Sequence, residues 1–213
     1  MVAMTGRWVF RGHIAGLGTG SGLRAVVGIW KASPFGAFTD VMVELPSGLR
    51  LLLAPRAEIA DFIQTTYTFD DVMLVPVHAA LGPNHESGKQ LQVHAGPLRI
   101  DARIGGPTKL GGLIALVPRA LAVHPRWLTL INPLAAALIP GVRTAGTASQ
   151  GRQEFYGVTK LRAINSAATT WKGHDAGPLA DISPAVRFGF SSVPTKPALA
   201  TVQTTIVASD PAE

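Results

Sequence analysis

The sequence predicts a mainly β (α+β) fold, in which a single domain forms an antiparallel barrel or cone with a short helical insertion. Apolar and polar residues alternate with the two-residue period of a β-strand over much of 7–53 and 154–207. Turns rich in glycine and proline separate these stretches at short intervals. With 47% hydrophobic and 15% charged residues, the 213-residue chain can bury a substantial core. We therefore expect one domain over 1–213, with an apolar, partly helical insertion at about 110–140.

The first predicted hairpin joins a strand at 7–14 to a strand at 23–30. Its connection carries glycine at alternate positions, namely Gly16, Gly18, Gly20 and Gly22. A phosphate-binding loop would lead from a strand into a helix, whereas these glycines lead into a strand. The glycines therefore predict a flexible turn.

A second hairpin is predicted from strands at 37–45 and 49–55, joined by a Pro-Ser-Gly turn. Residues 55–67 predict a short helix, because their isoleucine and phenylalanine residues recur at helical spacing. The helix has a proline near its first turn, where the missing N–H is tolerated.

Further strands are expected in the remainder of the chain. They are predicted at 69–81, as a hairpin at 89–106, and at 154–171, 185–192 and 198–209. The least strand-like region is the apolar insertion, which predicts one or two helices or a long apolar excursion. No internal repeat and no linker divides the chain.

The charge distribution argues against a nucleic-acid partner. The net charge is +6, but lysine and arginine are scattered singly from Arg7 to Lys196, without interleaved aromatic residues. The charge therefore predicts a weak attraction to anions in general, including a carboxylate ligand.

Two features bear on location. The chain has no cysteine, and the first residues lack the apolar core of a secretory signal, so we expect a cytoplasmic protein. The most apolar run, 126–143, is too short and too interrupted by Asn132, Pro133 and Pro140 to cross a bilayer as one helix. Contact of the segment 127–139 with a membrane surface or a partner protein stays open as an alternative.

Familiar catalytic and metal-binding motifs are absent from the sequence. None of the six histidines forms a metal-binding pair with another, and no Gly-x-Ser-x-Gly elbow is present. Asp70 and Asp71 are adjacent, so on a strand they would point to opposite faces, and a turn or capping role is expected. We predict neither a metal nor a cofactor.

Asp40 is the main candidate for chemistry. It shares one face of a predicted strand with Phe38 and Met42, which prefer to be buried, so its carboxylate is expected to be partly shielded from water. A buried charge needs a partner. The flanking strands offer Arg11, Arg24 and Arg50 as candidates.

Four stretches resemble successive parts of the acetoacetate decarboxylase family. They are FGAFTDVMVELPSGLRLLLAPRAEIA (35–60), LQVHAGPLRIDARI (91–104), ALIPGVRTAGTASQGRQEFYGVTKLRAI (137–164) and TTWKGHDAGPLADISPAVRFGFSSVPTKPALATVQTTIV (169–207). The resemblance implies the β-rich, cone-like barrel of that family. It also puts Asp40 at the position of the family's pocket glutamate and Phe38 at that of its tyrosine.

The resemblance fails at the catalytic lysine. In the family this lysine forms a Schiff base with the substrate, but the matching stretch here, 57–74, contains no lysine. Without an amine of lowered pKa, such a decarboxylation has no first step. Lys160 lies in a similar-looking stretch at 151–161, but that stretch comes far too late in the matched order, so we interpret it as coincidence.

The sequence thus predicts a small-molecule-binding barrel related to acetoacetate decarboxylases but lacking their lysine. A small apolar or carboxylate ligand would lie in the barrel mouth. Whether a reaction is catalysed stays open, and Asp40 is the candidate acid or base. The candidate ligand-binding residues are Phe38, Met42, Arg50, Trp127 and Tyr156. The alternative is a non-enzymatic protein that docks on a membrane or partner through the segment 127–139.

Overall fold

The strands form one curled sheet. The computed structural model describes residues 6–83, 89–138, 142–147, 152–189 and 191–208. From one edge to the other, its strands are β5 (Asp71–Leu74), β4 (Arg50–Ala54), β3 (Phe38–Glu44), β2 (Arg24–Ala32), β1 (Gly6–Thr19), β13 (Ala198–Ala208), β10 (Arg152–Trp171), β8 (Leu98–Pro107), β7 (Lys89–Ala95) and β6 (Val77–Pro83). The short strands β9 (Ala145–Thr147) and β11 (His174–Asp175) pair with β10, and β12 (Leu179–Ala180) pairs with β1. All pairs are antiparallel except β4 with β5.

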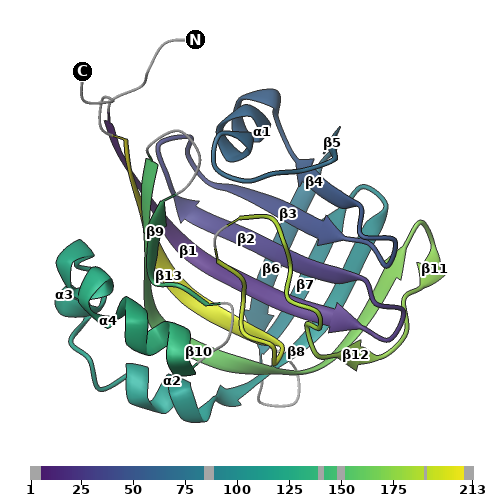
Figure 1. The fold of residues 1–213 in the computed structure, drawn as a ribbon. Coiled ribbons are helices and arrows are strands. Elements are labelled where there is room, and N and C mark those ends of the chain that lie inside the picture. Colours follow the sequence, from purple (N-terminus) through teal and green to yellow (C-terminus); the bar gives the residue numbers. More distant parts are fainter. Residues whose placement is uncertain (1–5, 84–88, 139–141, 148–151, 190, 209–213) are drawn as a thin grey trace.

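The sheet curls until β6 packs back against β3, so that β6, β7 and β8 lie behind β1, β2 and β3 (Figure 1). The space between these two walls is filled by buried apolar side chains, such as Val41 and Val43 of β3 and Leu91, Leu98 and Ile100 of β7 and β8. The predicted mainly β fold is confirmed, with a barrel-like sheet whose interior is packed with side chains. The assignment of the whole chain to one domain stays a prediction.

Helices and one long loop cover the outer face of the sheet. Helix α1 (Ala57–Gln64) packs near one end of β4, as the sequence predicted. Helices α2 (Lys109–Ile114), α3 (Arg119–Ala122) and α4 (Pro125–Leu138) confirm the predicted helical insertion and pack mainly on β10; we call 109–138 the helical cap. The covering loop, 181–189 and 191–197, crosses in front of β1 and β2 (Figure 1).

The glycine-rich connection differs from the prediction. Gly16 and Gly18 belong to β1, which continues to Thr19, and the turn begins only after it. A Cβ atom on Gly16 would lie 2.7 Å from the side chain of Val193, and one on Gly18 would meet the backbone oxygen of Asp181. The absence of side chains therefore lets the covering loop lie directly on the strand, and the predicted flexible turn is wrong at these two positions.

Two further strand predictions need correction. The stretch 69–81 divides around Pro76 into β5, which pairs parallel with β4, and β6, which pairs with β7. The described part of 185–192 is not a strand. Its alternation arises because Val186 and Phe188 turn inward from the covering loop, where both side chains are buried.

No helix in the described part of the chain is both long enough and apolar enough to cross a bilayer.

Candidate functional site

A cavity of about 470 Å³ lies between the outer face of the sheet and the elements that cover it. Its floor is formed by β1, β2, β3, β10 and β13, and its cover by α1, the helical cap and the covering loop. The volume falls within the range of about 300–1,000 Å³ that is typical of small-molecule sites. The lining is mostly apolar, with contributions from Phe10, Val26, Met42, Phe62, Trp127 and Ile131.

Strand alternation separates the cavity from the barrel interior. On β3, Phe38, Asp40 and Met42 line the cavity, whereas Val41 and Val43 point into the packed interior. The cavity is therefore on the outside of the barrel-like sheet, and the mouth of the barrel, where we expected the ligand, is not where this cavity lies.

Asp40 is buried and has an aromatic partner. Only 2% of the residue is exposed, and its Oδ1 accepts a hydrogen bond of 2.9 Å from Nε1 of Trp30. Burial raises the pKa of Asp40 to about 7, although the hydrogen bond from Trp30 opposes the shift. Gly28 stands opposite Asp40 on β2, and a Cβ atom there would lie 2.5 Å from Asp40 Oδ1 and 2.7 Å from Trp30 Nε1. A residue without a side chain is thus needed for this pair to fit.

The expectation that a flanking arginine would neutralise Asp40 is wrong. Each of the three candidates is engaged elsewhere: Arg11 with Gln203, Arg24 with Glu44, and Arg50 with Asp70. Strand direction explains this, because Arg24 and Arg50 pair with β3 at Glu44, the end remote from Asp40.

A second buried carboxyl group, Glu154 of β10, lies in the same cavity and binds two tyrosines. Its Oε2 accepts hydrogen bonds from the hydroxyls of Tyr156 at 2.7 Å and Tyr67 at 3.2 Å, and the two phenols also contact each other. Glu154 is 0% exposed, and burial raises its pKa to about 7. Its other oxygen, Oε1, has no hydrogen-bond partner among the described residues.

The two carboxyl groups act on a shared neighbour. Burial, followed by the charge of Glu154, raises the pKa of Tyr67 well above its ordinary value, and the charge of Asp40 adds to the shift. Thr66 and Thr204 also line the cavity, and their buried hydroxyls have no hydrogen-bond partner among the described residues. We call this set the polar cluster; its members are Trp30, Asp40, Thr66, Tyr67, Glu154, Tyr156 and Thr204.

Tyr67 is held in place by the elements around it. It follows α1, and the neighbouring Thr68 donates its N–H to the carbonyl of Phe188 at 2.8 Å. A Cβ atom on Gly189 would lie 2.8 Å from the ring of Tyr67, so this glycine lets the covering loop press against the phenol. The loop and the helix therefore position one phenol, and β10 positions the other.

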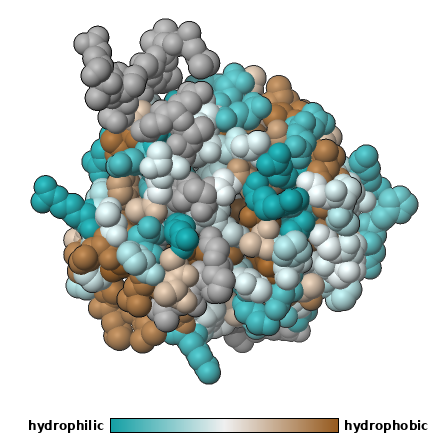
Figure 2. Space-filling view, viewed as in Figure 1, coloured by the Kyte–Doolittle hydropathy of each residue, from teal (hydrophilic) through white to brown (hydrophobic). Residues whose placement is uncertain are grey.

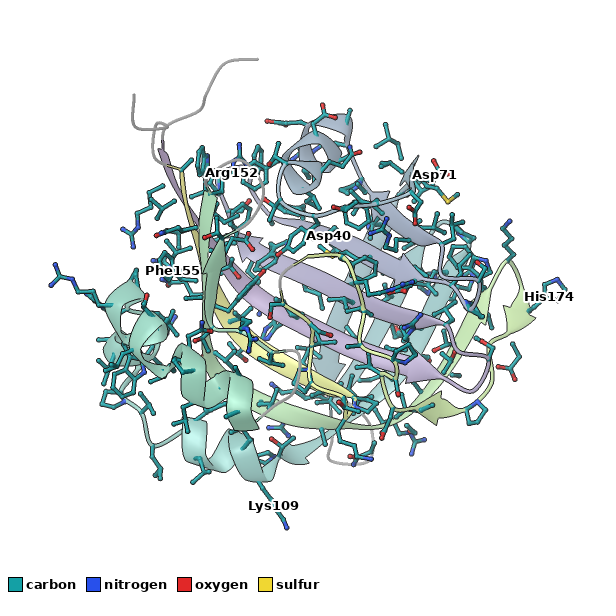
Figure 3. All side chains as sticks on the ribbon, viewed as in Figure 1. Asp40, Asp71, Lys109, Arg152, Phe155 and His174 are labelled. Atoms are coloured by element: carbon teal, nitrogen blue, oxygen red, sulfur yellow. The ribbon has the colours of Figure 1, made fainter. Side chains whose placement is uncertain are left out.

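Arg152 lies near the polar cluster on the same strand as Glu154 (Figure 3). Its guanidinium lies over the rings of Trp8 and Phe62, at 5.4 and 5.5 Å from their centroids, and donates to Oγ1 of Thr65. Its charge favours the ionised form of Glu154, but burial has the larger effect on the pKa. The arginine thus moderates the shift without abolishing it.

The structure brings most of the predicted site residues together. Phe38, Asp40, Met42, Trp127 and Tyr156 all line the cavity, whereas Arg50 does not and is bound to Asp70 at 2.7 Å. The predicted segment 127–139 contributes Trp127 to the lining, while residue 139 is outside the described residues.

Sequence reasoning missed Trp30, Tyr67 and Glu154. Glu154 precedes Tyr156 by two positions on a predicted strand, so the period of two could have placed both on one face. Tyr67 had no such signal, because it comes from a segment 87 residues away from Glu154.

The remaining candidates lie away from the cavity. Lys160 is exposed, and no lysine is among the cavity-lining residues that the structure describes. His78 and His94 stand opposite each other on β6 and β7, both exposed. Within the described ranges, no three His, Asp or Glu side chains are grouped to hold a metal ion; His85 is outside those ranges.

Comparison with known proteins gives no family. No protein-family model and no curated protein matches the sequence. A solved structure from Nitrosomonas europaea, described as an AttH, aligns with 97% of this chain at 10% identity and a TM-score of 0.30. The chain spans about half, 52%, of the length of that structure. A likeness this distant carries no argument, and the resemblance to acetoacetate decarboxylases stays a prediction.

Proposed function

We propose that the protein binds a small, mainly apolar molecule that carries one hydroxyl group, with the hydroxyl placed at the polar cluster. The observation that supports this proposal is the buried Oε1 of Glu154, which has no hydrogen-bond partner among the described residues and belongs to a side chain that lines an apolar cavity. A buried polar atom without a partner costs about 1–3 kcal/mol. A donating hydroxyl would recover that energy, while the aromatic and aliphatic walls would hold the rest of the molecule.

Of the two ligand classes expected from the sequence, the polar cluster favours the neutral one. A carboxylate ligand would approach Asp40 and Glu154, whose charges would repel it. The guanidinium of Arg152, on the same strand as Glu154, is engaged with Thr65 and two aromatic rings. Arg143 also lines the cavity, but it is an exposed residue. An alcohol faces no such repulsion and can donate its hydroxyl proton to Glu154.

Ligand titration tests the proposal. Trp30 and Trp127 line the cavity, so binding should change the intrinsic fluorescence of the protein. We expect decan-1-ol to bind saturably at pH 8 and at least about tenfold more tightly than decanoate, the equivalent of one lost hydrogen bond or more. Absence of saturable binding by the alcohol, or tighter binding of the carboxylate, would overturn the proposal.

A variant identifies the recognising atom. Wild-type protein should prefer the alcohol over its methyl ether, which cannot donate a hydrogen bond. Glu154→Met removes the acceptor and should abolish the preference. Glu58→Met, at an exposed position on α1, is the matched control and should retain it.

A second candidate function is proton transfer to or from the bound ligand. Asp40 and Glu154 both have a pKa of about 7, which suits a general acid or base near neutral pH. Ligands that co-purify with the protein can be identified by native mass spectrometry and incubated with it in D₂O. Deuterium entering carbon positions with wild-type protein but not with Asp40→Asn would support catalysis, and no incorporation would leave binding alone.

A further inference from the structure

Exposed leucines gather on the helical cap. Figure 2 shows hydrophobic surface over these helices, at the lower left of the view. The leucines concerned are Leu113, Leu116, Leu121, Leu130 and Leu134. Leu116 is 80% exposed and Leu130 is 72% exposed. Elsewhere in the described chain, the exposed large hydrophobic residues are Leu49 and Leu74, which stand apart on the hairpin and on β5. A group of exposed apolar residues in one region is typical of an interaction surface, whereas apolar residues exposed singly are common on any protein.

The charge around these leucines has one sign. The sequence contains no aspartate or glutamate between Asp101 and Glu154, and the cap itself carries Lys109, Arg119 and Arg126. All three are exposed, and Lys109 points outward from the molecule (Figure 3). None of the three forms an ion pair with another described residue.

The strands beneath the cap do not neutralise this charge. Helices α2 to α4 pack mainly on β8, β9 and β10. The carboxylates of those strands are Asp101, whose oxygens accept hydrogen bonds from Gln90 and Gln92, and Glu154, which is buried in the cavity. The apolar patch is therefore bordered by positive charge.

The patch also reaches the cavity. Leu113 and Leu134 are both exposed to solvent and part of the cavity lining, so the cavity borders on the same surface. The patch therefore lies beside the cavity that contains the polar cluster.

We propose that the helical cap docks on an anionic lipid bilayer. The leucines would enter the interface between headgroups and acyl chains, and the three basic residues would lie at the level of the lipid phosphates. Charge complementarity favours this occupant, because leucines bordered by bases alone match an apolar layer covered by negative headgroups. Docking would let an apolar alcohol pass from the bilayer into the cavity. This consequence rests on the function proposed above.

Vesicle co-sedimentation of the full chain, without added ligand, tests the docking. Vesicles of phosphatidylcholine are compared with vesicles of equal parts phosphatidylcholine and phosphatidylglycerol. We expect at least about tenfold stronger binding to the anionic vesicles, given the contribution of each basic residue near such a surface. Added salt should weaken it. Equal binding to both vesicles, or no binding to either, would overturn the proposal.

Matched double variants locate the surface. Leu116→Glu with Leu130→Glu should weaken binding to anionic vesicles by at least about tenfold. Leu49→Glu with Leu74→Glu makes the same chemical change at exposed leucines away from the cap and should bind like wild type. Both variants should melt like wild type, since the four leucines are exposed. Equal loss in both variants would refute the assignment to the cap.

Two further readouts separate this inference from its competitors. If sedimentation shows a wild-type dimer that the cap variant converts to a monomer, with no vesicle binding, the patch joins copies of this chain and the proposal fails. Decan-1-ol binding in solution should survive in the cap variant. If wild-type protein binds decan-1-ol but no vesicles, only the docking inference fails. If it binds anionic vesicles but not decan-1-ol, only the proposed ligand fails.

Discussion

The carboxyl group of Asp40 links the stability of the protein to pH. Its pKa is raised from 3.8 to about 7, whereas in the unfolded chain the group ionises near pH 4. Between these values the folded protein keeps a proton that the unfolded chain has lost, so stability falls as pH rises from about 4 to about 7. Glu154, with a pKa of about 7, acts in the same direction. For each group the full effect is on the order of 4 kcal/mol.

Replacing Asp40 by asparagine should remove its share of this pH dependence. An amide oxygen can still accept the hydrogen bond from Trp30, but it cannot ionise. The free energy of unfolding of Asp40→Asn, relative to that of wild type, should therefore increase by a few kcal/mol between pH 4 and pH 8. Urea unfolding at several pH values measures this difference.

Asp70 provides the opposite control. Arg50 lowers the pKa of Asp70 to about 2, so its contribution is present above about pH 4 and is lost as pH falls toward 2. Asp70→Asn should leave the change in the free energy of unfolding between pH 4 and pH 8 as it is in wild type. If Asp40→Asn also showed the wild-type change over this range, Asp40 would not link stability to pH.

At the scale of the elements, β1 and the covering loop depend on each other. Gly18 pairs with Ala180, and a Cβ atom on Gly18 would lie 3.0 Å from the carbonyl oxygen of Ala180 and closer still to that of Asp181. Because backbone atoms cannot rotate out of the way, Gly18→Ala should displace the loop and lower the free energy of unfolding by about 1–3 kcal/mol. Chemical denaturation measures the stability loss.

The same substitution should weaken ligand binding, because the loop covers the cavity. Gly106→Ala on β8 is the control, since nothing lies within 4 Å of the added carbon there. It should change stability by no more than about 0.5 kcal/mol. Similar effects of the two substitutions would show that the contact of the loop with β1 is unimportant.

The elements also show what the sequence can and cannot predict. Local periodicity placed β2 to β4, α1, β13 and the first part of β1 correctly, because each face of a strand or helix meets one environment along its length. The same signal misled at Val186 and Phe188, where a loop alternates because it packs against the sheet. On β10 a register shift between Val158 and Lys160 lets Leu161 return to the cavity face, which a strict period of two cannot anticipate.

The candidate site was predictable only in part for a related reason. Asp40 could be proposed because its neighbours on the same strand are apolar. Its partner Trp30 depends on the pairing of β2 with β3, and the contact of Tyr67 with Glu154 depends on the complete fold. Contacts between distant segments leave no periodic trace in the sequence.

At the scale of the whole molecule, the sheet separates stability from binding. Leu91 is fully buried in the barrel interior, whereas Met42 lines the cavity on the other face. Leu91→Ala should lower the free energy of unfolding by about 2–5 kcal/mol and leave ligand affinity nearly unchanged. Met42→Ala should cost less stability, because the residue is only partly buried, and should alter affinity by enlarging the cavity.

Thermal unfolding and alcohol titration of the same two variants measure both effects. Leu91→Ala should have the lower melting temperature of the two variants, and Met42→Ala should show the larger change in alcohol affinity. If Leu91→Ala shifted affinity as much as Met42→Ala, the interior and the cavity would be mechanically coupled.

The strict alternation on β3 has a consequence for how the chain folds. A slip of one residue against β2 would carry Asp40 into the apolar interior and bring Val41 and Val43 to the cavity. The misaligned sheet would then bury the carboxyl group of Asp40 in the apolar interior without the indole of Trp30, which is unfavourable. The acidic residue that we assign to the ligand site thus also disfavours a slip of one residue in the pairing of β3 with β2.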